Sequence, residues 1–174
     1  MSVIYSDLKN KKIFISGGGS GIGATIVEYF CEQNSDVYFI DINLKESKKL
    51  LAKIKKRKLK APKFIECDIT DIYKLQKTIE DIVKKKGPIN CLINNAANDD
   101  RHTTDQVNEK YWENRMAINL KHYFFAAQSV VKGMKKIKSG SIVNLSSVSW
   151  MLGEGDKVVY ETAKSAVIGL TRSF

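Results

Sequence analysis

Residues 16–23 read Ser-Gly-Gly-Gly-Ser-Gly-Ile-Gly, and they follow Lys12–Ser16, an apolar run suited to a buried strand. Glycines permit a tight turn and let the backbone approach a pyrophosphate closely. A helix beginning near Gly21 would direct its free N–H groups and its dipole toward the phosphates. The spacing is GxxxGxG rather than the GxGxxG of many dinucleotide enzymes. The segment predicts a strand–turn–helix unit for a dinucleotide; the alternative is a plain strand–helix loop.

The alternation of apolar runs and helical patterns continues along the chain. Further runs suited to buried strands lie at Val37–Asp41, Lys63–Ile69, Ile89–Asn94 and Ser141–Ser147. Apolar residues at helical spacing lie between them, at Ile22, Ile26 and Phe30, at Leu50, Leu51 and Ile54, and at Ile72, Leu75, Ile79 and Ile82. Longer helices are expected from about residue 106 to 134 and from about Val158 onward. This alternation predicts an α/β fold, a Rossmann-like, doubly wound parallel sheet, in a single domain over residues 1–174.

Composition favours one globular domain without a membrane or nucleic-acid partner. The 174 residues hold no run near the roughly 18 apolar residues of a membrane span, and residues 1–12 lack the apolar block of a signal peptide. A cytoplasmic protein is therefore expected. Residues 45–60 supply +8 of the net charge of +10, from nine bases against one acid, without interleaved aromatic residues; a solvated helix face is expected there. The three cysteines are expected to be reduced, and no metal site is expected.

Polar residues follow several of the predicted strands, where ligands of doubly wound sheets bind. Asp41 lies 20 residues past Gly21 (41 − 21), near the separation expected of a carboxylate that binds ribose hydroxyls; the alternative is a helix N-cap. Asp68 could face the adenine, or Asp68 or Thr70 could cap the following helix. The small residues of Asn94–Ala97 could let a strand end pass close to a cofactor, or could form a local turn.

A tyrosine and a lysine stand at helical spacing after the last predicted strand. Tyr160 follows Ser147 by 13 residues (160 − 147), and Lys164 lies one turn further on the same helix face. The reference pKa of tyrosine, about 10, is too high for a base at neutral pH, but a neighbouring ammonium favours the phenolate. The alternative is an ordinary surface pair.

In this order and on these elements, the motifs resemble those of the short-chain dehydrogenase/reductase family. Residues 16–23 resemble the family's TGxxxGxG turn with Ser16 in place of threonine, and residues 94–97 resemble its NNAG with Ala97 in place of glycine. The family's structural and catalytic asparagine and its catalytic serine, tyrosine and lysine are matched by Asn119, Ser147, Tyr160 and Lys164. The resemblance covers the whole chain.

The resemblance implies hydride transfer between NAD and a hydroxyl or carbonyl substrate. Tyr160 would exchange the proton, Ser147 would stabilise charge on the same oxygen, and Lys164 would lower the pKa of Tyr160 and bind the nicotinamide ribose. Asn119 would hold a water that links Lys164 to solvent. The residues implied in cofactor binding are Ser16, Gly17, Gly19, Ser20, Gly21, Ile22, Gly23, Asp41, Asp68, Ile69, Asn95, Ala96, Ala97, Tyr160 and Lys164. Asp41 would repel a 2′-phosphate, so NAD is expected over NADP.

Residues 98–102 and 148–153, and the segment 160–164 around the tyrosine, resemble the corresponding segments of bacterial aldose 1-dehydrogenases, such as those acting on D-xylose. The implied reaction oxidises C1 of an aldose to the lactone. Candidate sugar contacts are Asn98, Asp99, Arg101, His102, Ser149 and Trp150, which could instead be loop surface or packing. The alternatives are a 3-oxoacyl carrier-protein reductase or another short-chain reductase, and a non-catalytic nucleotide-binding fragment.

Family members continue past the position of Phe174 with two more strands and a substrate loop. The fold is therefore expected to be truncated after its fifth strand and the following helix, which would leave Ser141–Ser147 with an open edge. Weak NAD binding and very low turnover are expected of the 174-residue chain. The expected partners are a small-molecule substrate, which would be a sugar, and further copies of the chain in a homo-oligomer.

Overall fold

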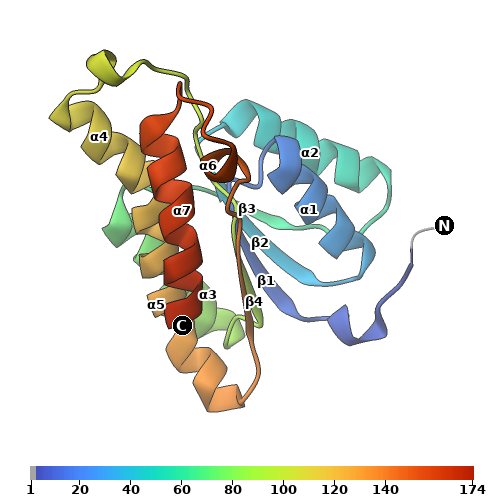
Figure 1. Cartoon of the computed structure of the whole chain (residues 1–174). Helices are drawn as coiled ribbons and strands as arrows, with labels where there is room; N and C mark the ends of the chain where they lie inside the picture. Colours follow the sequence, from blue (N-terminus) through green and yellow to red (C-terminus); the bar gives the residue numbers. More distant parts are fainter. Residues whose placement is uncertain (1–2) are drawn as a thin grey trace.

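The computed structural model describes residues 3–174, so the first two positions of the expected domain lie outside the described residues. Strands and helices alternate along the chain, and the sheet stands between helical layers (Figure 1). The strands are β1 Lys12–Ser16, β2 Asp36–Asp41, β3 Lys63–Glu66, β4 Cys91–Asn94 and β5 Ser141–Asn144. The α-helices are α1 Gly21–Glu32, α2 Leu44–Lys56, α3 Ile72–Lys86, α4 Glu109–Met116, α5 His122–Ile137, α6 Ser149–Leu152 and α7 Val158–Ser173. Short 3₁₀ turns span Ser6–Leu8 (η1) and Thr104–Gln106 (η2), and a π-helical turn spans Ala117–Lys121 (η3).

The five strands form one parallel sheet in the order β3-β2-β1-β4-β5. Side chains alternate along β1: Ile13 and Ile15 pack with α1 and α2, whereas Phe14 packs with α3 and α5. This period-2 alternation gives the sheet two buried faces, each covered by helices. The expected doubly wound α/β fold is confirmed.

Three of the expected strands are shorter than predicted. The apolar runs that end at Ile69 and Ser147 leave the sheet after Glu66 and Asn144, and the run expected from Ile89 enters the sheet at Cys91. Apart from the exposed Asp68, the residues of these runs that lie outside the strands are partly or fully buried, so hydrophobicity alone overestimated strand length. The helix expected over residues 106–134 is two helices joined by the η3 turn. The short helix α6 was not predicted.

The stripe expected on α1 is confirmed at Ile26 and Phe30, which pack against the core, and wrong at Ile22. Ile22 is 69% exposed, whereas Gly23, Val27 and Cys31 are buried. Gly23 has no side chain, so α1 can rest against the preceding turn at that residue, and the row at 23, 27 and 31 then faces the sheet. Among residues 3–174, no helix is both long and apolar enough to cross a membrane.

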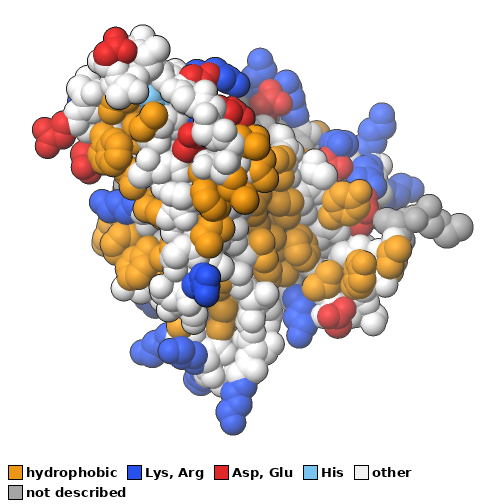
Figure 2. Space-filling model, in the orientation of Figure 1, with side chains coloured by type: hydrophobic (Ala, Val, Ile, Leu, Met, Phe, Trp, Pro, Cys, Tyr) orange, Lys and Arg blue, Asp and Glu red, His pale blue; other side chains and the backbone are white. Residues whose placement is uncertain are grey.

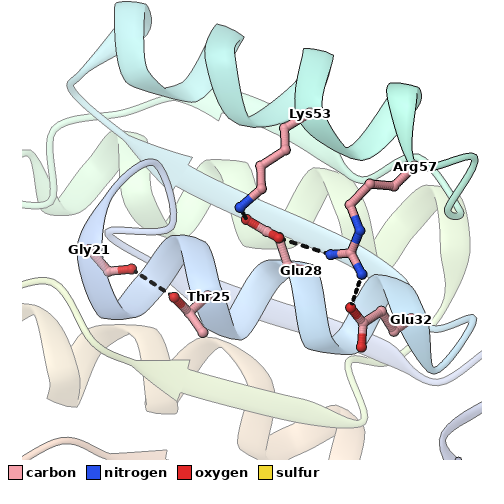
Figure 3. Close-up of polar contacts among 6 residues, drawn as sticks. All are labelled: Gly21, Thr25, Glu28, Glu32, Lys53 and Arg57. Carbon is pink, nitrogen blue, oxygen red and sulfur yellow. Dashed lines mark hydrogen bonds and ion pairs between the residues drawn. The ribbon is translucent and has the colours of Figure 1, made fainter. Parts of the chain in front are cut away.

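The lysine-rich helix α2 points its basic residues outward, and Figure 2 shows Lys and Arg side chains projecting from the surface in that region. Two acidic residues of α1 form ion pairs with basic residues of the α2 segment (Figure 3). Glu28 accepts from Lys53 at 2.6 Å and from Arg57 at 3.0 Å, and Glu32 also pairs with Arg57. The basic run is therefore in part an intramolecular contact between α1 and α2, because the carboxylates of α1 compensate some of its charge.

Candidate active site

The turn after β1 is bound to the end of β4. The side-chain amide of Asn95 donates to the carbonyl oxygens of Ser16 at 3.0 Å and of Gly17 at 2.9 Å. In return, the Ser16 hydroxyl accepts the backbone N–H groups of Asn95 and Ala96, both at 3.1 Å. The glycine-rich turn and the Asn94–Ala97 segment therefore form one hydrogen-bonded unit at the carboxyl edge of the sheet.

Two glycines of the turn stand where a side chain cannot. A Cβ on Gly17, which has φ +66°, would lie 2.8 Å from the Cα of Ala96; a Cβ on Gly23 would lie 1.9 Å from the carbonyl oxygen of Gly17. Within the described residues, the N-cap of α1, Ser20, makes no side-chain capping bond. The N–H groups of the first turn of α1 are therefore available to an anion, which fits the pyrophosphate of a dinucleotide.

Asp41 turns its carboxylate toward the glycine turn. One oxygen accepts from the backbone N–H of Gly19 at 2.8 Å, and the other accepts from Asn43 at 2.8 Å. The helix that follows is capped by Asn43, which accepts from Glu46, so the capping alternative for Asp41 is wrong. A carboxylate fixed beside the turn is suited to the hydroxyls of an adenosine ribose.

The Asp68 carboxylate accepts hydrogen bonds from the backbone N–H and from the hydroxyl of Thr70, both at 2.8 Å. Helix α3 is capped by Asp71, which accepts from Lys74 at 2.9 Å. Neither Asp68 nor Thr70 is the cap, so that alternative is also wrong. Asp68 is exposed and remains free to meet an adenine.

Tyr160 and Lys164 lie on the same face of α7, as their spacing predicted. The Lys164 ammonium is 5.6 Å from the centroid of the Tyr160 ring. Ser147 lies in the loop after β5, where its hydroxyl is 2.9 Å from that of Ser149 and accepts the Ser149 N–H at 3.2 Å. Helix α6, which begins at Ser149, packs against α7 and brings this loop toward the Tyr160 helix.

Lys164 is only 1% exposed, and burial lowers its pKa from 10.5 to about 8. Its ammonium donates to the Tyr123 hydroxyl and to the Leu145 carbonyl, both at 2.8 Å. The Tyr123 hydroxyl in turn donates to the same carbonyl at 3.1 Å. Tyr123 was missed in the sequence, where it looks like an ordinary apolar position of a buried helix face; its one signal is a hydroxyl one turn after Asn119.

Asn119 holds the loop that follows β4. It is fully buried in the η3 turn; its amide oxygen accepts from the Asn98 N–H at 2.8 Å, and its amide nitrogen donates to the Asn98 carbonyl at 3.0 Å. Isolated π-helical turns occur often at functional sites, because the extra residue redirects side chains. Here the turn separates α4 from α5 and faces α7.

The expected sugar contacts occupy different environments. Asp99 is exposed and Trp150 is 37% exposed, so both can meet a ligand. Ser149 is 4% exposed and bound to Ser147, and Arg101 pairs with Asp156. His102 is 6% exposed, and both ring nitrogens already have partners.

Residues 11–174 match the family profile described as short chain dehydrogenase. The chain belongs to this family. Members of the short-chain dehydrogenase family are oxidoreductases that act on CH–OH groups with nicotinamide cofactors, which agrees with the glycine turn, Asp41 and the Tyr160–Lys164 face.

Several of the similar proteins carry the names of sugar dehydrogenases, and others are named 3-oxoacyl-[acyl-carrier-protein] reductase. D-xylose 1-dehydrogenase of Caulobacter vibrioides is 40% identical over 99% of this chain and 67% of its own length. A protein of Rhizobium meliloti named "Probable galactose dehydrogenase" is 38% identical over 97% of this chain and 66% of its own. The solved structure of Thermoplasma acidophilum aldohexose dehydrogenase superposes with a TM-score of 0.84 at 30% identity, covering 97% of this chain and 62% of that one. The chain thus spans about two thirds of the length of these relatives.

His122, next to Tyr123, gives a pH-dependent prediction. The ring is fully buried; burial, and then the charge of Lys164, lower its pKa from 6.5 to about 3. Below about pH 6.5 the unfolded chain binds a proton at this site that the folded chain does not accept until about pH 3, so stability falls on acidification. The loss expected from this residue is about 2 kcal/mol between pH 6.5 and pH 5.

The measurement is urea unfolding at both pH values for the wild type and for His122→Leu, which cannot take up the proton. The variant should lose about 2 kcal/mol less than the wild type over this interval, because all other titrating groups are shared. Equal losses in the two proteins would contradict the assignment of a neutral buried His122.

Proposed function

We propose that the protein oxidises an aldose at C1 to the lactone, with NAD as the hydride acceptor. The observation that carries the proposal is the 40% identity to D-xylose 1-dehydrogenase across 99% of this chain. The site geometry supports it, because the candidate groups Ser147, Tyr160 and Lys164 lie in the loop after β5 and on α7, which pack together through α6.

The residues of this chain have separate tasks in the proposed reaction. The Tyr160 side-chain oxygen takes the proton of the C1 hydroxyl, and Ser147 donates a hydrogen bond to the substrate oxygen while the C1–O double bond forms. Lys164 lies beside the Tyr160 ring and would exchange its contacts with Tyr123 and Leu145 for the ribose of the cofactor. NAD, when bound, supplies the acceptor for the C1 hydride.

The dinucleotide would be held along the carboxyl edge of the sheet. The first turn of α1 would bind the pyrophosphate, Asp41 the adenosine ribose, and Asp68 and Ile69 the adenine. Residues 95–97 would lie against the rest of the cofactor. Of the candidate sugar contacts, we retain Asn98, Asp99, Arg101, Ser149 and Trp150.

A screen of NADH formation over D-xylose, D-galactose and D-glucose tests the substrate, with D-xylose 1-dehydrogenase as the positive control. Reduction of a 3-oxoacyl thioester with NADPH is measured in parallel. Turnover of at least one aldose is expected; turnover of the thioester alone would contradict the sugar assignment but not the family. Cofactor binding without any turnover would instead favour a nucleotide-binding role.

We further expect NAD to bind at least tenfold more tightly than NADP. The Asp41 carboxylate would repel a 2′-phosphate, and its neighbours Ile42 and Asn43 carry no positive charge, although Lys45 lies two residues further. Asp41→Asn keeps the side-chain shape and removes the charge, so the preference should shrink by about tenfold, or about 1.4 kcal/mol. Calorimetric titration of both proteins with both dinucleotides measures this; tighter binding of NADP by the wild type would refute it.

A further inference from the structure

Helix α7, which carries Tyr160 and Lys164, begins without a cap of its own. Its N-cap residue is Lys157, which makes no side-chain capping bond within residues 3–174 and has no acceptor atom to offer. The first N–H groups of a helix lack intrahelical partners, and a cap normally accepts from the second or third of them. Tyr160 is the third residue after the cap (160 − 157), so fraying of this turn would move it directly.

His102 supplies the missing acceptor from a distant loop. The N–H of Val159, the second residue of α7, donates to Nε2 of His102 at 3.4 Å, across 57 positions of sequence. The backbone N–H of His102 donates to the carbonyl of Asp156 at 2.8 Å, which holds the same loop against the start of the helix. An ion pair between Arg101 and Asp156 joins the two segments again.

The opposite side of the imidazole is also fixed. Nδ1 lies 2.9 Å from the Tyr111 hydroxyl and 3.1 Å from the Asp100 carbonyl, and the Tyr111 ring packs edge-on at 5.0 Å. Since Nε2 accepts from Val159, this hydrogen-bond network assigns the proton of the neutral ring to Nδ1, which donates toward Asp100. Arg115 of α4 binds the Asp100 carboxylate at 2.8 Å and so helps to hold Asp100 in place beside the imidazole.

We propose that His102 is a positioning residue: it caps α7 from the loop after β4 and thereby sets the place of the Tyr160 hydroxyl. The same loop is bound to Asn119 through Asn98, so one hydrogen-bonded segment links the η3 turn to the helix of Tyr160. With the ring 6% exposed and both nitrogens bound, nothing remains for a sugar hydroxyl, and the expected sugar contact at His102 is replaced by this role. The proposal rests on the assignment of the proton transfer to Tyr160.

Three substitutions separate capping from mere packing. The amide of His102→Gln can reach the place of Nε2, whereas the shorter amide of His102→Asn reaches only the place of Nδ1; His102→Ala removes both. Thr104→Ala, in the same segment but exposed and outside the proposed sugar contacts, is the control. Hydrogen exchange of the Val159 and Glu161 amides in the 174-residue chain is measured for each, with the amides of α3 as internal reference.

Exchange at both amides should rise at least tenfold in His102→Ala and His102→Asn and stay near wild type in His102→Gln and Thr104→Ala. Where aldose turnover is measurable, kcat should fall by about tenfold to a hundredfold in the first two, be largely restored in the glutamine variant, and leave NAD affinity unchanged. A glutamine variant no better than alanine, or unchanged exchange in alanine, would overturn the proposal. A raised KM for the sugar with unchanged exchange would overturn it in favour of substrate contact. Absence of aldose turnover in the wild type, with the predicted exchange pattern intact, would refute the sugar assignment alone.

Discussion

Gly23→Ala should abolish detectable NAD binding and destabilise the fold by roughly 3 kcal/mol. The new methyl would lie 1.9 Å from the Gly17 carbonyl oxygen and 2.6 Å from the Asn95 amide nitrogen, and that nitrogen already binds the Ser16 and Gly17 carbonyls. Backbone cannot yield as a flexible side chain can. Either α1 moves away from the turn or Asn95 loses its contacts, and both outcomes disrupt the proposed pyrophosphate site.

Gly169→Ala provides the matched control for this substitution. Gly169 lies on the exposed side of α7, a Cβ there meets nothing within 4 Å, and alanine is the better helix former. This variant should bind NAD as the wild type does and gain up to about 1 kcal/mol. Titration with NAD and urea unfolding measure both effects. Wild-type affinity in Gly23→Ala would show that the turn and α1 tolerate separation and that the close contact is dispensable.

Tyr160→Phe should reduce turnover by about a thousandfold and leave NAD affinity within about twofold of the wild type. The ring remains to pack, but no oxygen is left to take the proton of the substrate hydroxyl. Lys164→Ala should impair both properties, because the ammonium acts on the phenol and would also meet the cofactor ribose. If turnover falls in both variants but NAD affinity falls only in Lys164→Ala, then proton transfer and dinucleotide binding depend on different groups.

The control is Tyr73→Phe, which removes a phenol that is 79% exposed on α3 and should change neither quantity. Turnover of the variants is compared in a form of the protein that oxidises an aldose. NAD binding is compared in the 174-residue chain. Retention of more than a tenth of the wild-type turnover by Tyr160→Phe would rule out this phenol as the proton acceptor.

Local pattern was enough for the architecture of the sheet. The alternation of Ile13, Phe14 and Ile15 marks a strand with two buried faces, and the glycines after it mark a turn that meets a helix start. The pair Tyr160 and Lys164 needed only helical spacing to be placed on one face. Element limits were less accurate, as at the ends of β3 and β5, because residues under a loop can be as apolar as residues in a strand.

Sequence alone therefore determined the alternation of strands and main helices, the strand–turn–helix start of the fold, and the candidate groups for cofactor binding and proton transfer, since each depends on residue type and short spacing. Only the tertiary structure decided what those groups bind. Asn95 meets Gly17 across 78 positions, Lys164 meets Tyr123 across 41, and His102 meets Val159 across 57. A hydrogen bond forms over about 3 Å, so its existence depends on where the packed elements bring two distant atoms, and no local pattern records that distance.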